Sequence, residues 1–435
     1  MIRPWTIQGC RMAFGMWKAG LCLFLATAAV AQEPSQADLA VAEVARKAVE
    51  EGRYLDAEQT LRRAAFDARG VAKAGDAYDQ WAEVHGLLDG EPGPAIPEPD
   101  VPIDAEQQAA IARLKAATPH DALATIVEQA KTHRLVILNE DHASPRDRAF
   151  GWQVAKALRP LGYDVLGIET LNNVADDHEA AGMMATLARR GYVNRVSTGY
   201  YVRDPVFADF VRQALKIGYR PVAYETTDFA PKGDVVAQIE AREQAQADFV
   251  VRRALQRYPE SKILLYVGFS HATENPSDMD GRTVSWLATR LKAMTGIDPL
   301  TIDQTTLNAN GAGKANLYAA VADRIGTKPA VMFADGTPLL VGHYAGLVDL
   351  QVAHPRTMRI GGRPDWLLAM GRTPTPIPAN LLPKRGQRLV QAFVTGETDA
   401  IPVDQVVVTA GSPPPVLMLP AAPVTYVVQD TPTPR

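Results

Sequence analysis

Short apolar runs alternate with helical patterns through the middle of the chain. The runs predict strands at 135–138, 165–168, 221–223, 263–267 and 330–333. Between them, apolar residues at helical spacing predict helices, notably over 146–159 and 234–257. Alternation of strands and helices is typical of a mostly parallel sheet with helices on both faces. The sequence therefore predicts an α/β core.

Both ends of the chain differ from this middle part. Residues 32–90 have helical spacing and predict a helical hairpin region, in which 52–58 resembles part of one tetratricopeptide unit; a stable array needs about three units. Prolines predict a linker over 91–105. The α/β core then spans 106–345. Pro-rich turns and β-type segments predict a small β-rich C-terminal module over 346–435.

The first 31 residues have the pattern of a secretory signal peptide. Their few charges are all basic, and an apolar run, Leu21–Val30, precedes the small residues around Ala31. The run is too short to span a bilayer. We therefore expect an exported protein, periplasmic or extracellular, without a transmembrane anchor. Cys10 and Cys22 both lie in this segment, so the mature protein has no thiol for a disulfide or a nucleophile.

Composition narrows the class of protein further. Of 435 residues, 47% are hydrophobic and 22% are charged, which excludes a chain that is disordered throughout. The 45 basic and 49 acidic residues give a net charge of −4. Nothing in this balance indicates a nucleic-acid partner.

Ionisable residues follow all five predicted strands. They are Glu140 and His142, Glu169, Glu225, His271, and Asp335. In an open α/β sheet, ligands bind outside the carboxyl ends of the strands. A single acid after a strand usually caps a turn, but five such ends in succession predict a shared polar site.

Two helices add to this site. Ser144-Pro145, with Asp147 two residues later, predicts a capped helix that begins just after His142. In the second helix, Arg242 shares a face with apolar residues. An inward arginine needs a carboxylate partner, and Glu140, Glu169 or Glu225 could supply it. The alternative is an arginine that snorkels at the edge of the apolar stripe.

These residues resemble a known superfamily. Asn139-Glu140-Asp141-His142 resembles the Gly-Glu-x-His signature of the erythromycin-esterase-like and ChaN-type haem-binding-uptake superfamily, which is related to TraB/Tiki proteins. Glu169 at the next strand end, the helix with Arg242, and the stretch from Gly268 to His271 follow in the family's order. The resemblance covers about 130–275, roughly a third of the chain. Asn139 stands where the family has glycine.

The resemblance implies three chemistries that would draw on the same side chains. Esterase members use a histidine as general base without metal, Tiki-like members resemble metal-dependent peptidases, and ChaN-type members bind haem. The shared set is Glu140, His142, Glu169, Arg242 and His271. If a divalent transition metal is bound, Glu140, His142, Glu169 and His271 are its expected ligands.

Our principal hypothesis is an exported hydrolase that acts on an ester or amide of a small molecule or peptide. His142 or His271 would take a proton from water, held by Glu140 or Glu169, and Arg242 would stabilise the oxyanion. Tyr200, Tyr201, Glu225 and Ser270 are the expected substrate-binding residues. Residues 268–272 also approximate a serine nucleophile elbow, but that motif needs a helix directly after the serine, and Asn275-Pro276 interrupts one.

Two other functions remain open from the sequence. In a haem- or ligand-binding protein, Tyr192, Tyr200, Tyr201 and Phe207 would wall a flat ligand; alternatively, the tyrosines pack their segment onto the sheet. In an inactive scaffold, the terminal regions would carry protein contacts, for which the N-terminal helices are the candidates.

Overall fold

The computed structural model describes residues 36–73, 75–94, 103–228, 233–279, 281–309 and 315–431. The expected signal peptide, 1–31, and the middle of the expected linker lie outside the described residues.

In this part of the chain, the central sheet has nine strands. They are β1 (Thr118–Asp121), β2 (Leu135–Glu140), β3 (Tyr163–Ile168), β4 (Arg220–Ala223), β5 (Lys262–Gly268), β8 (Leu300–Asp303), β9 (Ala330–Ala334), β10 (Thr337–Pro338) and β11 (Leu350–Ala353). The order is β1-β9-β11-β8-β2-β5-β3-β4, with β10 beside β9. The six strands from β11 to β4 are mutually parallel, and β1, β9 and β10 form the antiparallel end. The expected mostly parallel sheet is confirmed.

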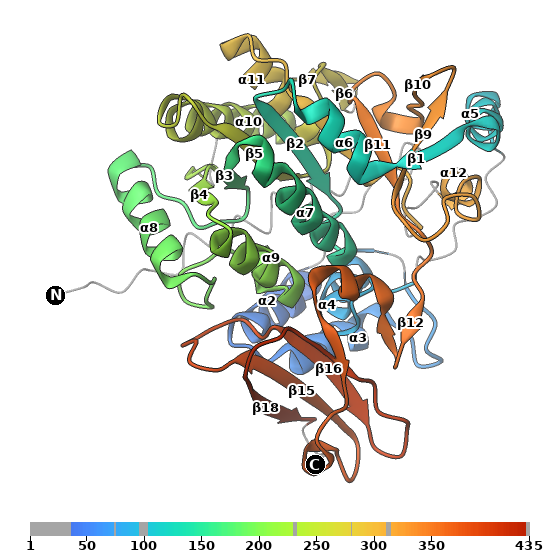
Figure 1. The fold of residues 1–435 in the computed structure, drawn as a ribbon. Helices are drawn as coiled ribbons and strands as arrows, with labels where there is room; N and C mark the ends of the chain where they lie inside the picture. The colour runs from blue at the N-terminus through green and yellow to red at the C-terminus, as the bar shows by residue number, and fades with distance from the viewer. Residues whose placement is uncertain are drawn as a thin grey trace.

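Helices cover both faces of this sheet, as Figure 1 shows. The helices of the α/β core are α5 (Ala105–Ala116), α6 (Ala122–Ala130), α7 (Pro145–Leu158), α8 (Asp177–Arg190), α9 (Pro205–Lys216), α10 (Val235–Val250), α11 (Leu287–Thr295) and α12 (Ala315–Ala319). Along β2, Val136 and Leu138 pack with α6, α7 and α9, whereas Leu135 and Ile137 pack with α10 and α11. This alternation follows from the two-residue period of a strand, and it explains why β2 is apolar without interruption from Leu135 to Leu138.

Strand order decides which strand ends meet. β2, β5, β3 and β4 are adjacent and parallel, so their carboxyl ends, which carry Glu140, His271, Glu169 and Glu225, share one edge of the sheet. The fifth expected end does not join them. β9 runs antiparallel to β11, and Asp335 lies exposed in the turn to β10. Asp335 therefore lies away from the other four strand ends, because an apolar run does not reveal strand direction.

The two terminal regions pack against each other below the sheet in Figure 1. The N-terminal region has three helices, α2 (Gln36–Glu50), α3 (Tyr54–Ala65) and α4 (Asp76–Asp89). The C-terminal region is a small β-rich module, as expected, built around the antiparallel sheet β16-β15-β18. Leu389 of β15 belongs to the apolar cluster of α2–α4. The C-terminal module therefore covers part of the surface of the N-terminal helices.

The smaller elements complete the description. The remaining strands are β6 (Ser277–Met279), β7 (Arg282–Val284), β12 (Arg359–Ile360), β13 (Arg363–Pro364), β14 (Thr373–Thr375), β15 (Gln387–Val394), β16 (Asp404–Thr409), β17 (Leu417–Leu419) and β18 (Val424–Asp430). Single 3-10 turns lie at Arg159–Leu161, Tyr201–Arg203, Phe269–Ala272, Gly342–Tyr344, Asp365–Met370 and Ala379–Leu381, and α10 continues into a π-helical turn at Val251–Gln256. Among the described residues, no helix has the length and apolar character needed to cross a membrane.

Candidate functional site

Glu140, the last residue of β2, is held by a buried arginine. Arg148 on α7 binds both carboxylate oxygens of Glu140, at 2.9 and 3.0 Å, and its third nitrogen lies 2.9 Å from Asp204. The side chains of Glu140, Arg148 and Asp204 are each at most 2% exposed. Burial would raise the pKa of Glu140, but Arg148 and His142 outweigh it and hold this pKa below its usual range. Glu140 is therefore a fixed anion.

His142 takes its orientation from this anion. Its Nδ1 lies 2.9 Å from Glu140 Oε1, and its ring stacks on Tyr201 with centroids 4.1 Å apart. A carboxylate at Nδ1 favours the tautomer with the proton on Nδ1, which leaves Nε2 as an acceptor. The side chain is 17% exposed, so the ring is packed but remains reachable.

The helix after His142 begins as predicted, but the expected side-chain cap at its start is absent. Ser144 is the N-cap and Pro145 the first helical residue, yet the Ser144 side chain makes no capping hydrogen bond. Asp147 instead accepts the backbone N–H of Asp141 at 3.0 Å. This part of the prediction was wrong, because the whole first turn is buried and Asp147 is drawn into the loop before the helix.

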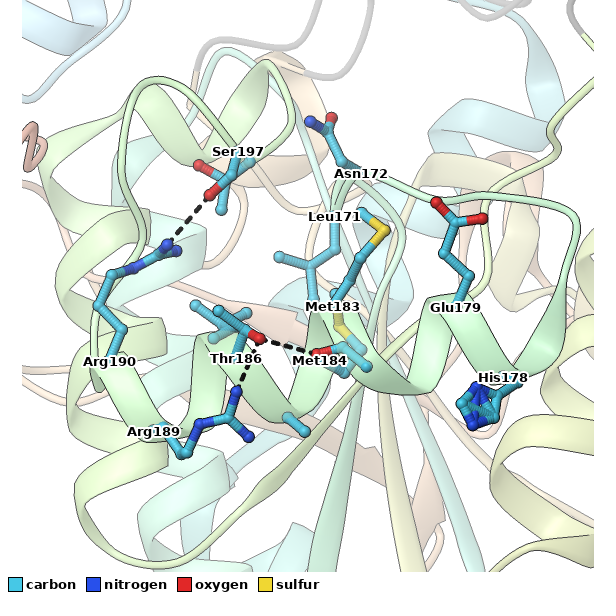
Figure 2. A pocket seen from close by; sticks show the side chains of 14 residues that line it. Leu171, Asn172, His178, Glu179, Met183, Met184, Thr186, Arg189, Arg190 and Ser197 are labelled. Atoms are coloured by element: carbon cyan, nitrogen blue, oxygen red, sulfur yellow. Dashed lines mark hydrogen bonds between the residues drawn. The ribbon is translucent and has the colours of Figure 1, made fainter. Parts of the chain in front are cut away.

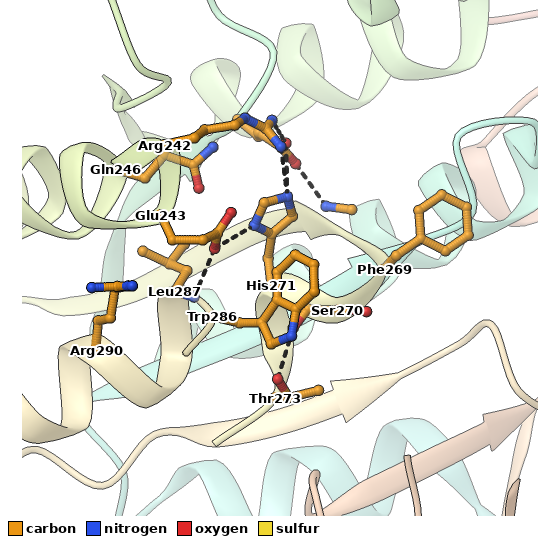
Figure 3. A network of polar contacts seen from close by, with 12 residues as sticks. Arg242, Glu243, Gln246, Phe269, Ser270, His271, Thr273, Trp286, Leu287 and Arg290 are labelled. Atoms are coloured by element: carbon orange, nitrogen blue, oxygen red, sulfur yellow. Dashed lines mark hydrogen bonds and ion pairs between the residues drawn. The ribbon is translucent and has the colours of Figure 1, made fainter. Parts of the chain in front are cut away.

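A second charged network lies at the ends of β3, β4 and β5. Arg242 on α10 binds Glu169 and Glu225, as its inward position predicted, and does not contact Glu140. Glu169 also accepts the backbone N–H of Gly268 at 2.7 Å. Figure 3 shows His271 between Arg242 on one side and Glu243 on the other.

His271 is held between carboxylates and Arg242 in this network. Its Nδ1 lies 2.8 Å from Glu243 and its Nε2 lies 3.2 Å from Glu169. Burial would lower the pKa of His271, but the two carboxylates raise it to about 10. In turn, burial opposes the charge on Glu169, and His271 and Arg242 hold its pKa well below the usual range. The two carboxylates thus favour a protonated ring, whereas Arg242, whose Nη1 lies 3.2 Å from Nε2, can only donate to that nitrogen. Both ring nitrogens of His271 are therefore already engaged by protein groups.

A water-sized hollow lies between the two networks. Its volume is about 10 Å³, which is the space of roughly one water molecule. Its lining residues are Glu140, His142, Glu169, Thr170, Tyr201, Phe207, Tyr266 and Val267. The hydroxyl of Tyr266 is buried, and beyond burial itself the neighbouring Glu140 carboxylate raises its pKa. The hollow thus has room for one water beside Glu140, His142 and Tyr266.

Gly268 keeps this hollow open. A Cβ on Gly268 would lie 2.6 Å from His142 Nε2 and 3.4 Å from Glu169 Oε2. Its φ of −88° is one that any residue adopts. Glycine is therefore needed here for space and not for its backbone conformation.

Asn139, which replaces the family's glycine, joins three strand ends. It is fully buried, donates to the carbonyl of Phe269 and to Asp303, both at 3.0 Å, and accepts the N–H of Gln304. Phe269 has φ of +34°, an uncommon and strained conformation for a non-glycine residue. Asn139 thus fixes the turn between Gly268 and His271.

The other expected binding residues divide between the site and the packing around it. Glu225 belongs to the network through Arg242. Tyr201 lines the hollow, whereas Tyr200 packs against the N-terminal helices. Ser270 is buried with its hydroxyl 3.0 Å from that of Tyr344, and a short 3-10 turn rather than a helix follows it.

The ionisable side chains do not form a metal-ligand cluster. Within the described residues, no group of three or more His, Asp or Glu side chains is arranged to hold an ion. Of the four ligands expected for a metal, Glu140 is engaged by Arg148, Glu169 by Arg242, and His271 by carboxylates at both nitrogens. Three of the four expected ligands thus already have protein partners, and His142 keeps its Nε2 open.

Sequence reasoning missed three residues of the site. Arg148 and Asp204 orient Glu140, and Glu243 holds His271. The run of charges from Arg146 to Arg148, beside a stripe of buried residues, was a signal for Arg148. Nothing in the sequence distinguished the buried Glu243 from the part-exposed Glu240 on the same helix.

Comparisons with known proteins give little beyond this geometry. No family model and no curated protein matches the sequence. Some solved structures are similar, and the chain spans 37% of the first, a bacterial protein toxin with 19% identity over 42% of this chain and a TM-score of 0.30. The type III effector HopBA1 shares 14% identity over 55% of this chain and 95% of its own, with a TM-score of 0.32. The RRSP effector domain of a Vibrio vulnificus MARTX toxin shares 16% identity over 65% of this chain and 61% of its own, with a TM-score of 0.30. Similarities at this level carry no argument about function.

Proposed function

We propose that this protein is a hydrolase of the erythromycin-esterase-like and ChaN type, in which His142 activates water for attack on an ester or amide. The water-sized hollow carries the proposal. It has room for one water beside His142, whose Nδ1 faces Glu140 and whose Nε2 is left as an acceptor, and Tyr266 lines the same hollow.

In the first step, the water oxygen attacks the carbonyl carbon while its proton moves to His142 Nε2. This transfer makes His142 cationic. Glu140 and Asp204 carry two negative charges against the single positive charge of Arg148, so the cation is stabilised where it forms. Glu140 also keeps the ring in the tautomer that the step requires.

In the second step, the tetrahedral intermediate collapses and His142 returns the proton to the leaving oxygen or nitrogen. The developing oxyanion needs a fixed positive charge. Arg242 meets this need, because its side chain is 22% exposed and is held by Glu169 and Glu225. His271 takes a positioning role behind Arg242, because both of its ring nitrogens are engaged by Glu243, Glu169 and Arg242.

The test is a hydrolase screen with matched histidine variants. Purified protein is assayed on chromogenic esters and amides in ¹⁸O-labelled water, which places one label in the acid product. We expect His142→Ala to lose about 100-fold or more of the activity, the usual contribution of a general base. His120→Ala is the control, because His120 is exposed on the edge strand β1. Full activity in His142→Ala would overturn the proposal.

The same preparation tests the other functions expected from the sequence. An absorption spectrum with a Soret band would indicate haem binding, and stoichiometric metal by elemental analysis would indicate a metal-dependent hydrolase. Either result, with no hydrolysis in the metal-stripped protein, would contradict the metal-free mechanism.

We propose that the protein acts after export. The basic residues and the Leu21–Val30 run support this proposal. Intact-mass analysis of periplasmic or secreted protein should give Gln32 as the first residue. A full-length cytoplasmic form as the main species would contradict it.

A further inference from the structure

A second and much larger cavity runs along α8, outside the proposed catalytic machinery. Its volume is about 580 Å³, within the range of roughly 300–1,000 Å³ that small-molecule sites have. Figure 2 shows the side chains that line it. Nothing in the hydrolytic mechanism uses this space.

The middle of the cavity is apolar and adaptable. Leu171, Met183 and Met184 lie at its centre in Figure 2, and Leu187 lines it as well. Methionine is flexible and polarisable, so paired methionines accommodate apolar ligands of different shape. Neither methionine is fully buried, which is expected of a surface left for a ligand.

One end of the cavity is cationic. Arg189 donates to the Thr186 hydroxyl at 2.9 Å, and Arg190 donates to the Tyr192 carbonyl and the Ser197 hydroxyl at 2.8 and 3.0 Å. Within the described residues, neither guanidinium has a carboxylate within 4.0 Å, in contrast to Arg148. Burial lowers the pKa of Arg190, as happens when no anion compensates the charge.

Basic residues in the last turn also offset the helix dipole, and this explains a positive charge at the end of α8. It does not explain an open apolar cavity that ends at two arginines with only neutral partners. A guanidinium fork binds a carboxylate through parallel hydrogen bonds. The pair thus fits an anionic group on an apolar body.

The cavity lies next to the water-sized hollow. Glu169 and Thr170 line the hollow, and the two residues that follow them line the cavity. A second segment also reaches from one to the other, because Thr198 lines the cavity and Tyr201 lines the hollow. The N–H of Tyr201 donates to the Thr170 hydroxyl at 3.0 Å, which joins the two segments between the cavities.

We propose that this cavity binds a small apolar carboxylate, with its body along Met183 and Met184 and its carboxylate at Arg189 and Arg190. The proposal goes beyond the hydrolysis and does not depend on it. Acyl chains and acylated apolar amino acids share this chemistry.

Titration calorimetry with four probe molecules, each of eight carbons or fewer, tests which class of ligand the cavity binds. Octanoate has both the apolar chain and the carboxylate. Octan-1-ol lacks the charge, octylamine has a positive charge instead, and butyrate has a shorter chain. We expect octanoate to bind at least about tenfold more tightly than the other three. N-acetyl-leucine is measured alongside octanoate. Tighter binding of octanoate would identify the ligand as an acyl chain, and tighter binding of N-acetyl-leucine would identify it as an acylated amino acid. Equal binding of octanoate and octylamine would overturn the proposal.

Variants then place the ligand. Arg190→Gln and Met184→Gln should each weaken octanoate binding about tenfold or more. Arg113→Gln, an exposed arginine on α5, should leave it unchanged. His142→Ala should also bind normally, so a failed hydrolysis assay and a failed binding assay remain distinguishable. Binding that is insensitive to Arg190→Gln would refute the site.

Discussion

Substitution of Gly268 by alanine should close the water-sized hollow. The added Cβ would lie 2.5 and 2.6 Å from Cε1 and Nε2 of His142, whereas carbon atoms in contact are about 3.5–4.0 Å apart. The imidazole must therefore move by about 1 Å, and a displacement of that size costs roughly 100-fold in rate. The backbone of Gly268 is relaxed, so we expect only the overpacking cost, about 1–3 kcal/mol of unfolding free energy.

The assay is kcat on an ester substrate together with urea unfolding. Gly167→Ala is the matched control, because its Cβ would lie 2.4 Å from Leu265 in the core, away from His142. Both variants should lose similar stability, and only Gly268→Ala should lose the reaction. Where no substrate is yet in hand, the imidazole resonances of His142 should shift in Gly268→Ala alone. Wild-type kcat in a folded Gly268→Ala protein would refute the water site.

Three further results are expected. Arg148→Met should lower the unfolding free energy by about 3–5 kcal/mol in urea titrations, because it leaves Glu140 and Asp204 buried without their cation; an unchanged midpoint would contradict this. Because the pKa of His271 is raised to about 10, its contribution to stability is complete below its unfolded pKa of about 6.5 and is lost as the pH rises through 10. Urea midpoints should therefore fall between pH 8 and 10 in the wild type and stay flat in His271→Gln. Ser270→Ala should keep its kcat, since in the part of the chain that the structure describes the hydroxyl is buried beside that of Tyr344; loss of activity with an intact fold would restore the serine as a candidate nucleophile.

Much of the fold followed from periodicity, but strand direction did not. The run at 135–138 is apolar at every position because β2 is covered on both faces, and such a run predicts a central parallel strand. The run at 330–333 has the same composition, yet β9 is antiparallel to its neighbours. Its direction depends on partners far away in the sequence, which a local pattern does not contain.

The residues that strand topology brings together could be predicted from the sequence. The side-chain pairs that they form could not. Glu140, Glu169 and His271 follow strands that parallel pairing brings to one edge. His142 keeps one ring nitrogen open, while both nitrogens of His271 are engaged, and this difference depends on which side chains face each ring. For His271 the deciding residue is Glu243, one of several glutamates on an amphipathic helix.

The packing of α4 has a consequence for how the site is completed during folding. A Cβ on Gly86 would lie 3.1 Å from the carbonyl of Ala143, so α4 lies directly on the loop that carries His142. α4 is itself tied to the C-terminal module, since Arg363 and Gln405 donate to the carbonyls of Leu88 and Leu87. Contacts of such long sequence separation form slowly. The loop that carries His142 thus gains its final support only after almost the whole chain has been made.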